Sequence, residues 1–244
     1  MYETGYADGY GMSATAIYWM IFIGIAIASW LVQWNLNRKT EKYSQMLSFR
    51  GLTGKDVAEM MLRANGITDV KVISTAGRLT DHYNPADQTV NLSEIVYGSN
   101  SIMAVAVAAH ECGHAIQHAH AYGPLTLRSK LVPVVSFASQ WMQWLLLGGM
   151  LMLSYTGSGT VLLIGVILFS MTTLFSFITL PVEIDASRRA IKWLDSAGLT
   201  DTRTHAAAVD ALRSAAYTYV VAALGSLATL LYYVMLLAGS RRND

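Results

Sequence analysis

The chain has 244 residues, of which 53% are hydrophobic and only 14% are charged, with a formal net charge of +1. This composition is too apolar for an ordinary soluble domain, and the balanced charge argues against a nucleic-acid partner. The single cysteine, Cys112, excludes an intramolecular disulfide, which suits an active part that lies in the cytoplasm.

Four stretches without acidic, basic or histidine residues account for the apolar excess, and each is long enough to cross a membrane as a helix. They cover residues 13–34, 131–155, 160–180 and 217–238. Tryptophan and tyrosine lie near several of their ends, as is typical of membrane interfaces. The missing charges argue against a proton-coupled transporter or a charge-lined channel.

Basic residues predict the orientation of these spans. Ten lie between the first and second spans and five between the third and fourth, whereas only Arg241 and Arg242 follow the last. By the positive-inside rule, both long polar segments are expected in the cytoplasm and the N-terminus on the outer side of the membrane. The leader carries Glu3 and Asp8 but no basic residue, so it is not expected to be a removed signal peptide.

Residues 101–120 (SIMAVAVAAHECGHAIQHAH) carry the clearest chemical pattern, an H-E-x-x-H motif after an apolar run. Ser101 is suited to cap a helix here. His110 and His114 then lie one turn apart on one face, where two imidazoles can share a divalent ion, usually zinc. Glu111 lies beside them, placed to accept a proton from water that the metal activates.

The other polar residues of this helix are assigned structural roles. Cys112 lies roughly opposite the two motif histidines, so a buried thiol is expected instead of a metal ligand. His118 and His120 are expected at the polar rim, because a ligand two turns from His110 would not fit a tetrahedral site. A buried helix with hydrogen-bonded histidines is the less favoured alternative for the whole motif.

A small mixed region precedes the motif. Thr53 and Asp56 form a capping-box pattern that predicts a helix over residues 55–64. Three strand-like runs follow, at residues 70–73, 78–83 and 88–92. We expect a largely antiparallel sheet packed on the motif helix, with an edge that could hold an extended peptide. His82 and Tyr83 are candidates to contact substrate or an oxyanion, although ordinary strand surface is the commoner role.

Two histidines and a water leave zinc one protein ligand short. Where the third span ends, Pro181 is suited to the first turn of a new helix, in which Glu183 and Asp185 would both lie. A membrane hairpin leaves the bilayer on the side where it entered, so this stretch should return beside the motif helix. Either carboxylate could complete the site.

Three segments carry a resemblance to a known family: residues 79–85 (LTDHYNP), 108–118 (AAHECGHAIQH) and 181–187 (PVEIDAS). They resemble the YugP-like bacterial membrane zinc metallopeptidases, and the order of elements is similar to that of HtpX-like and CAAX-processing membrane peptidases. The resemblance implies a gluzincin-type site with Glu183 as the third zinc ligand.

The chain departs from the related pattern, in which an aspartate follows the glutamate by four residues. That position is Ser187 here, which could hydrogen-bond a ligand histidine, so Asp185 remains an alternative ligand. Arg188 or Arg189 could stabilise an oxyanion, although solvated charge at the membrane edge is the more ordinary role of both.

The sequence therefore predicts an α-helical integral membrane protein with about four transmembrane helices and a small α+β, zincin-like metallopeptidase domain on the cytoplasmic side. Its expected parts are an N-terminal transmembrane helix (1–36), a cytoplasmic α+β part with the motif helix (37–130), a transmembrane hairpin (131–180), cytoplasmic helices with the third ligand (181–215) and a C-terminal transmembrane helix (216–244).

The expected function is that of a zinc-dependent endopeptidase with Zn²⁺ as cofactor, Glu111 as general base and a peptide or protein as substrate. The chain would work in contact with membrane lipid. A catalytically inactive, metal-binding membrane adaptor is the first alternative, and a transporter is a less favoured one. No feature of the sequence selects a particular membrane protein partner or a homo-oligomer.

Overall fold

The structure, a computed structural model, describes residues 14–240. The leader with Glu3 and Asp8, and the terminal Arg241 and Arg242, lie outside the described residues. The elements in chain order are α1 (Ala14–Ser44), α2 (Gly54–Ala64), β1 (Lys71–Thr75), β2 (His82–Asn84), β3 (Thr89–Ser93), α3 (Glu94–Gly98), α4 (Ile102–Ala119), α5 (Gly123–Thr156), α6 (Thr160–Ser196) and α7 (Thr202–Ser240).

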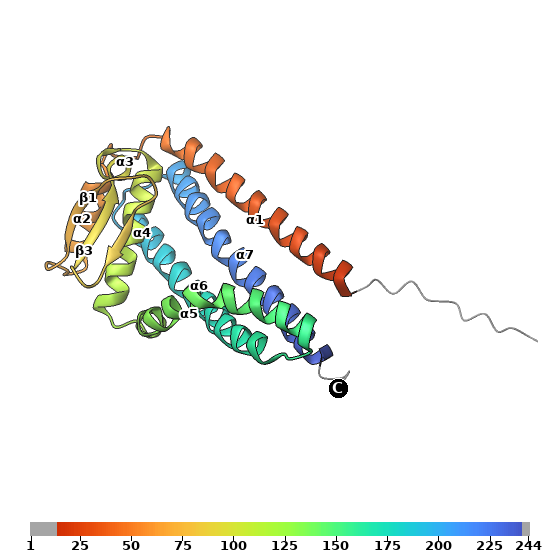
Figure 1. Ribbon diagram of the computed structural model, residues 1–244. Helices are drawn as coiled ribbons and strands as arrows, with labels where there is room; N and C mark the ends of the chain where they lie inside the picture. The colour runs from red at the N-terminus through yellow and green to blue at the C-terminus, as the bar shows by residue number, and fades with distance from the viewer. Residues whose placement is uncertain (1–13, 241–244) are drawn as a thin grey trace, which may run out of the picture.

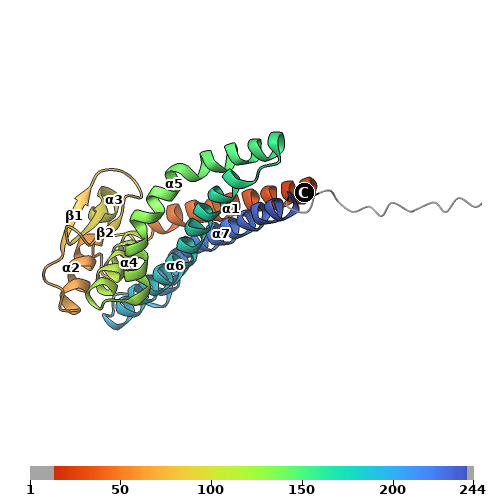
Figure 2. The same ribbon diagram turned by 60° about the horizontal axis from the view of Figure 1, so that its bottom comes forward.

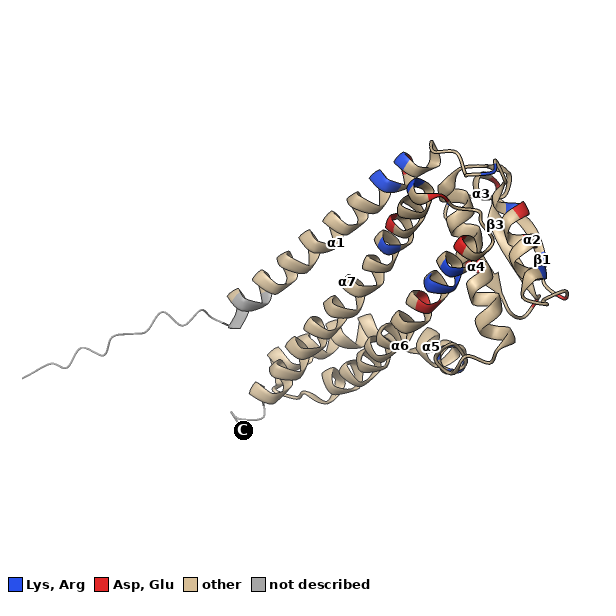
Figure 3. Cartoon of the chain, turned by 180° about the vertical axis from the view of Figure 1, so that it is seen from behind, with Lys and Arg blue, Asp and Glu red and all other residues tan. Residues whose placement is uncertain are grey.

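Four of these helices, α1, α5, α6 and α7, are long and apolar enough to cross a membrane, as predicted. Helix α5 packs on α6, α6 packs on α7, and α7 packs on α1, while the sheet and the short helices lie at one end of this layer (Figures 1 and 2). Charged residues gather at that same end, and the far parts of the long helices carry none (Figure 3). The arrangement suits apolar helices in lipid with a polar part outside it.

Helix α6 corrects one prediction. No new helix begins at Pro181, because α6 continues through it to Ser196. The physical reason is a stripe of fully buried side chains at a spacing of four residues, which packs the second half of α6 into the core together with α4. That stripe consists of Val182, Ala186, Ala190 and Leu194. The apolar span and the segment with Glu183 are therefore one rigid element.

The sheet corrects a second prediction. Its order is β1-β3-β2, and β1 runs parallel to β3, while only β2 pairs with β3 antiparallel. Residues 78–81 are not strand, because Gly77 and Leu79 have positive φ values of 107° and 58° and turn the chain. The chain between Thr75 and Thr89, which includes β2, is long enough for the crossover that parallel strands require. Strand β2 is left at an edge of the sheet.

The core of the polar end forms where α2, β3 and α4 meet. Helix α2 has the predicted capping box, in which Thr53 and Asp56 bond to each other's backbone, and the Thr53 hydrogen bonds hold the pKa of Asp56 below its ordinary value. Cys112 is fully buried, as predicted, and burial raises the pKa of its thiol.

Helix α7 runs unbroken into the fourth span. At its start, the Asp201 carboxylate accepts a hydrogen bond from the Thr204 N–H at 2.7 Å.

Candidate metal centre

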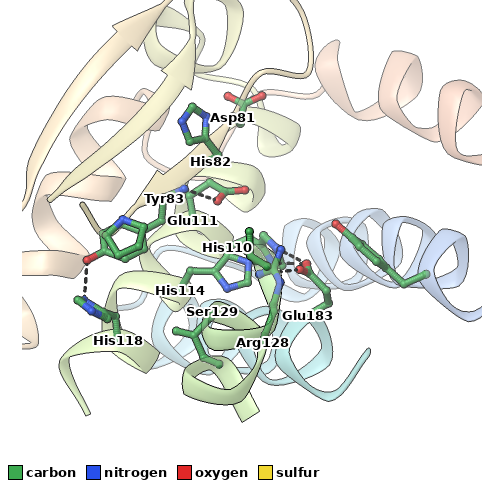
Figure 4. A pocket seen from close by; sticks show the side chains of 14 residues that line it. Asp81, His82, Tyr83, His110, Glu111, His114, His118, Arg128, Ser129 and Glu183 are labelled. Atoms are coloured by element: carbon green, nitrogen blue, oxygen red, sulfur yellow. Dashed lines mark hydrogen bonds and ion pairs between the residues drawn. The ribbon is translucent and has the colours of Figure 1, made fainter. Parts of the chain in front are cut away.

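Three side chains from two helices converge beside the sheet. His110 and His114 project from α4 and Glu183 projects from α6, and one ligand atom of each lies within 4.8 Å of the others. The Glu183 Oε2 atom is 3.3 Å from Nε2 of His110 and 3.6 Å from Nε2 of His114 (Figure 4). His114 and Glu183 are buried, with 8% and 3% exposed. Two imidazoles and a carboxylate match the donor set of catalytic zinc sites, which keep a fourth position open.

A close approach of the two helices makes this convergence possible. A Cβ atom added at Gly113 would lie 2.6 Å from the backbone oxygen and 3.0 Å from Cα of Ala186. Because both of these are backbone atoms, no side-chain rotation could relieve the clash. Gly113 therefore sets the distance between α4 and α6, and so the distance between the histidines and Glu183.

We expect Gly113→Ala to separate α4 from α6, lowering the stability of the metal-free protein by about 1–3 kcal/mol and weakening zinc binding. Gly148→Ala is the matched control, because an added Cβ there meets nothing within 4 Å. Thermal unfolding and zinc titration of both variants check the prediction. Equal melting temperatures and zinc affinities in the two variants would contradict it.

Gln117 determines which nitrogen of His114 is free. The Gln117 Nε2 atom donates to the Val182 carbonyl and to Oδ2 of Asp185, each at 2.8 Å. Its Oε1 therefore accepts from Nδ1 of His114, at 3.0 Å. The opposite amide orientation would set an oxygen against two acceptors. Nδ1 thus carries a proton, and Nε2 is the nitrogen that faces Glu183 and would bind a cation.

Ser187 and Asp185 occupy different surroundings from the three converging residues. Ser187 Oγ lies 3.1 Å from Nδ1 of His110, on the ring side away from Glu183. Asp185 instead accepts hydrogen bonds from Gln117 and from Nε of Arg189, the latter at 2.6 Å. Glu183 therefore lies against the two histidines, whereas Asp185 accepts a hydrogen bond from Gln117 and does not contact them directly.

The carboxylates around His114 favour a positive charge between the two histidines and Glu183. Burial lowers the pKa of His114, but its hydrogen bond to Glu183 and the charges of Glu111 and Glu183 outweigh burial, so the net direction is upward. A pocket that stabilises an imidazolium also stabilises a bound cation.

Glu111 lies next to the centre without joining it. Its Oε2 accepts a hydrogen bond from the backbone N–H of Tyr83 on β2 at 3.1 Å, and its side chain is 8% exposed. The Tyr83 hydroxyl lies 2.9 Å from Nδ1 of His118, and burial raises the pKa of Tyr83. His82 is exposed and lies with Nδ1 2.7 Å from the Thr80 carbonyl.

A cavity of about 310 Å³ opens onto the three converging residues, with His82, Tyr83, Glu111 and His118 on one side. The opposite wall was not predicted from the sequence. It comprises Leu125, Arg128, Ser129 and Val132 of α5 and Tyr219 of α7. The four α5 residues recur at positions i, i+3, i+4 and i+7, a helical face that could have been recognised before the second span. No pattern in the sequence around Tyr219 indicates that it lines the cavity.

Arg128 is the charged residue of this wall. Its Nη1 atom is 3.7 Å from Oε1 of Glu183, the carboxylate oxygen that faces away from the histidines. Arg189, in contrast, is bound to Asp185, lies over the Tyr122 ring and does not line the cavity. Arg189, the less favoured candidate for an oxyanion contact, therefore lies away from the centre, and Arg128 faces Glu183.

Comparisons with known proteins agree with this geometry. The family described as "Putative neutral zinc metallopeptidase" matches residues 18–238. The Bacillus subtilis (strain 168) protein "Putative membrane protease YugP" is 44% identical over 229 residues, covering 92% of this chain and 100% of that relative. No solved structure matches. Zinc is the cofactor that the family implies, and the chain belongs to the family of "Putative neutral zinc metallopeptidase" proteins, as the resemblance of its motifs predicted.

Proposed function

We propose that the protein is a membrane-embedded, zinc-dependent endopeptidase. The observation that carries the proposal is the meeting of His110, His114 and Glu183 within 4.8 Å, with the carboxylate of Glu111 beside them. Three ligands leave room for water and substrate, whereas a purely structural zinc site would fill all four positions with side chains. The basic residues of the polar segments support a site that faces the cytoplasm, with the N-terminus on the outer side of the membrane.

His110, His114 and Glu183 would hold the zinc ion. When bound, zinc acts as a Lewis acid and lowers the pKa of water from about 16 to about 7. Glu111 would accept a proton from the attacking water and deliver it to the leaving amine. The Tyr83 N–H on Oε2 of Glu111 supports this role, because it holds the carboxylate in one position while leaving the other oxygen available.

The edge strand β2 would bind the substrate. It pairs with β3 on one side only, and its Tyr83 N–H points away from that pairing, toward Glu111. An extended peptide added to this edge would run past the metal ligands. Arg128 and Tyr219, on the opposite wall, are the groups that we assign to the carbonyl oxygen of the scissile bond, in place of Arg189.

The test is cleavage of casein and of a quenched fluorescent peptide by the purified protein in detergent. We expect hydrolysis to fall to the level of the buffer control after treatment with a zinc chelator, and to return when one equivalent of Zn²⁺ is added. Hydrolysis that survives complete zinc removal would exclude the mechanism. Stoichiometric zinc with no hydrolysis of any substrate would favour the inactive adaptor.

A further inference from the structure

The cavity at the metal centre lies at the level where three long helices enter or leave their uncharged spans. Val132 of α5 and Tyr219 of α7 are the second and third residues of the second and fourth spans. Glu183 of α6 is the third residue after the third span. A helix rises 1.5 Å per residue, so each of the three lies within about 5 Å of the end of its span along the helix axis. The metal centre is therefore expected at the surface of the membrane that these spans would cross.

Helix packing leaves the cavity open on the side of the spans. Helices α5 and α7 both pack on α6, and Leu146 of α5 and Tyr233 of α7 belong to one apolar cluster deep in the spans. Within residues 14–240, however, no extensive packing joins α5 directly to α7. At the cavity, Val132 and Tyr219 are 45% and 38% exposed, although both belong to apolar spans.

The face of α5 that lines the cavity continues uncovered into the second span. Ser129 and Val132 line the cavity, and both are exposed. Ser136, Ser139 and Gln143 follow on the same face at helical spacing, and all three are exposed as well. Transmembrane helices use serine and glutamine to pack closely and to hydrogen-bond with one another. A polar face that leads from the metal centre into the lipid is therefore suited to a second transmembrane helix.

We propose that the substrate is a membrane-anchored protein whose transmembrane helix docks on this face of α5, beside the metal centre. This inference rests on the proposed peptidase function and names its substrate class. An extended chain covers about 3.3 Å per residue, so the bond to be cut would lie within about five residues of the anchor. Docking of the anchor would also hold this bond at the centre at an effective concentration in the millimolar range, on the order of 1 mM.

The test uses the full-length, zinc-loaded protein in bicelles, in which both membrane faces are open to solvent. Three substrates carry the same cleavable peptide: one directly after a transmembrane helix, one after the same helix and a flexible spacer of about 20 residues, and one without an anchor. We expect kcat/KM for the directly anchored substrate to exceed that of the soluble peptide about 100-fold, and that of the spaced substrate about tenfold.

Ser136→Trp tests the docking face, because Ser136 lies one turn deeper than Val132 and does not line the cavity. It should lower the ratio of anchored to soluble hydrolysis about tenfold. Val134→Trp is the matched control, since Val134 is 43% exposed on the opposite side of the same turns of α5, and should keep the wild-type ratio.

A photoreactive residue in the last turn of the anchor gives a second readout that needs no hydrolysis. In the Glu111→Gln protein it should label α5, and labelling of α1 alone would overturn the docking face. Equal hydrolysis of the three substrates, or an unchanged ratio in Ser136→Trp, would overturn this inference and leave the peptidase in place. Failure to cleave any of the three would overturn the proposed function and this substrate assignment together.

Discussion

Glu111→Gln is expected to lower the rate of peptide hydrolysis by a factor of about 10² to 10⁴ while leaving zinc bound. Glutamine has the same shape as glutamate, and its amide oxygen can still accept the Tyr83 N–H that now binds Oε2. It cannot take up a proton from water, however. Because Glu111 is not among the three converging ligands, zinc affinity should change little. Zinc content and steady-state kinetics of the purified variant check both parts of the expectation.

Glu94→Gln is the matched control, since Glu94 is an exposed glutamate in the first turn of α3, away from the centre. It should hydrolyse peptide at the wild-type rate. In Glu111→Gln the loss should fall on kcat and kcat/KM equally, because proton transfer occurs only in the transition state. A zinc-loaded Glu111→Gln protein with a wild-type kcat would refute the general-base role.

Glu183→Ala is expected to remove nearly all zinc from the purified protein, whereas Asp185→Ala should retain it with an affinity about 10- to 100-fold weaker. The reason is geometric. Glu183 Oε2 lies 3.3 Å and 3.6 Å from the Nε2 atoms of His110 and His114. Asp185 acts on His114 only through Gln117, by orienting the amide that accepts the Nδ1 proton.

Metal analysis after dialysis and competition with a zinc-binding dye measure these two variants directly. Ser196→Ala is a suitable control on the same helix, because Ser196 is exposed and bonds only to a backbone carbonyl of its own turn. Zinc retained by Glu183→Ala but lost by Asp185→Ala would reverse the assignment and make Asp185 the ligand.

The local parts of the site could be predicted from the sequence because they depend on neighbours along the chain. A helix places residues four apart on one face, so the spacing of His110 and His114 defined a two-histidine pair before any fold was known. Apolar runs of sufficient length likewise specify the four membrane-sized helices. Glu183 could be predicted as a ligand because a membrane hairpin returns to the side where it began, and because the family resemblance implies a glutamate at this position.

Long-range packing decided the rest, since strand pairing and helix contacts join residues that carry no local mark of each other. The parallel pairing of β1 with β3, the passage of α6 through Pro181 and the entry of Arg128 and Tyr219 into the cavity wall are all of this kind. The sequence by itself determined which side chains can bind zinc and which segments are apolar enough to enter lipid. Only the tertiary structure decided that Gly113 lets α4 and α6 touch, which brings ligands from two separate helices within reach of one ion.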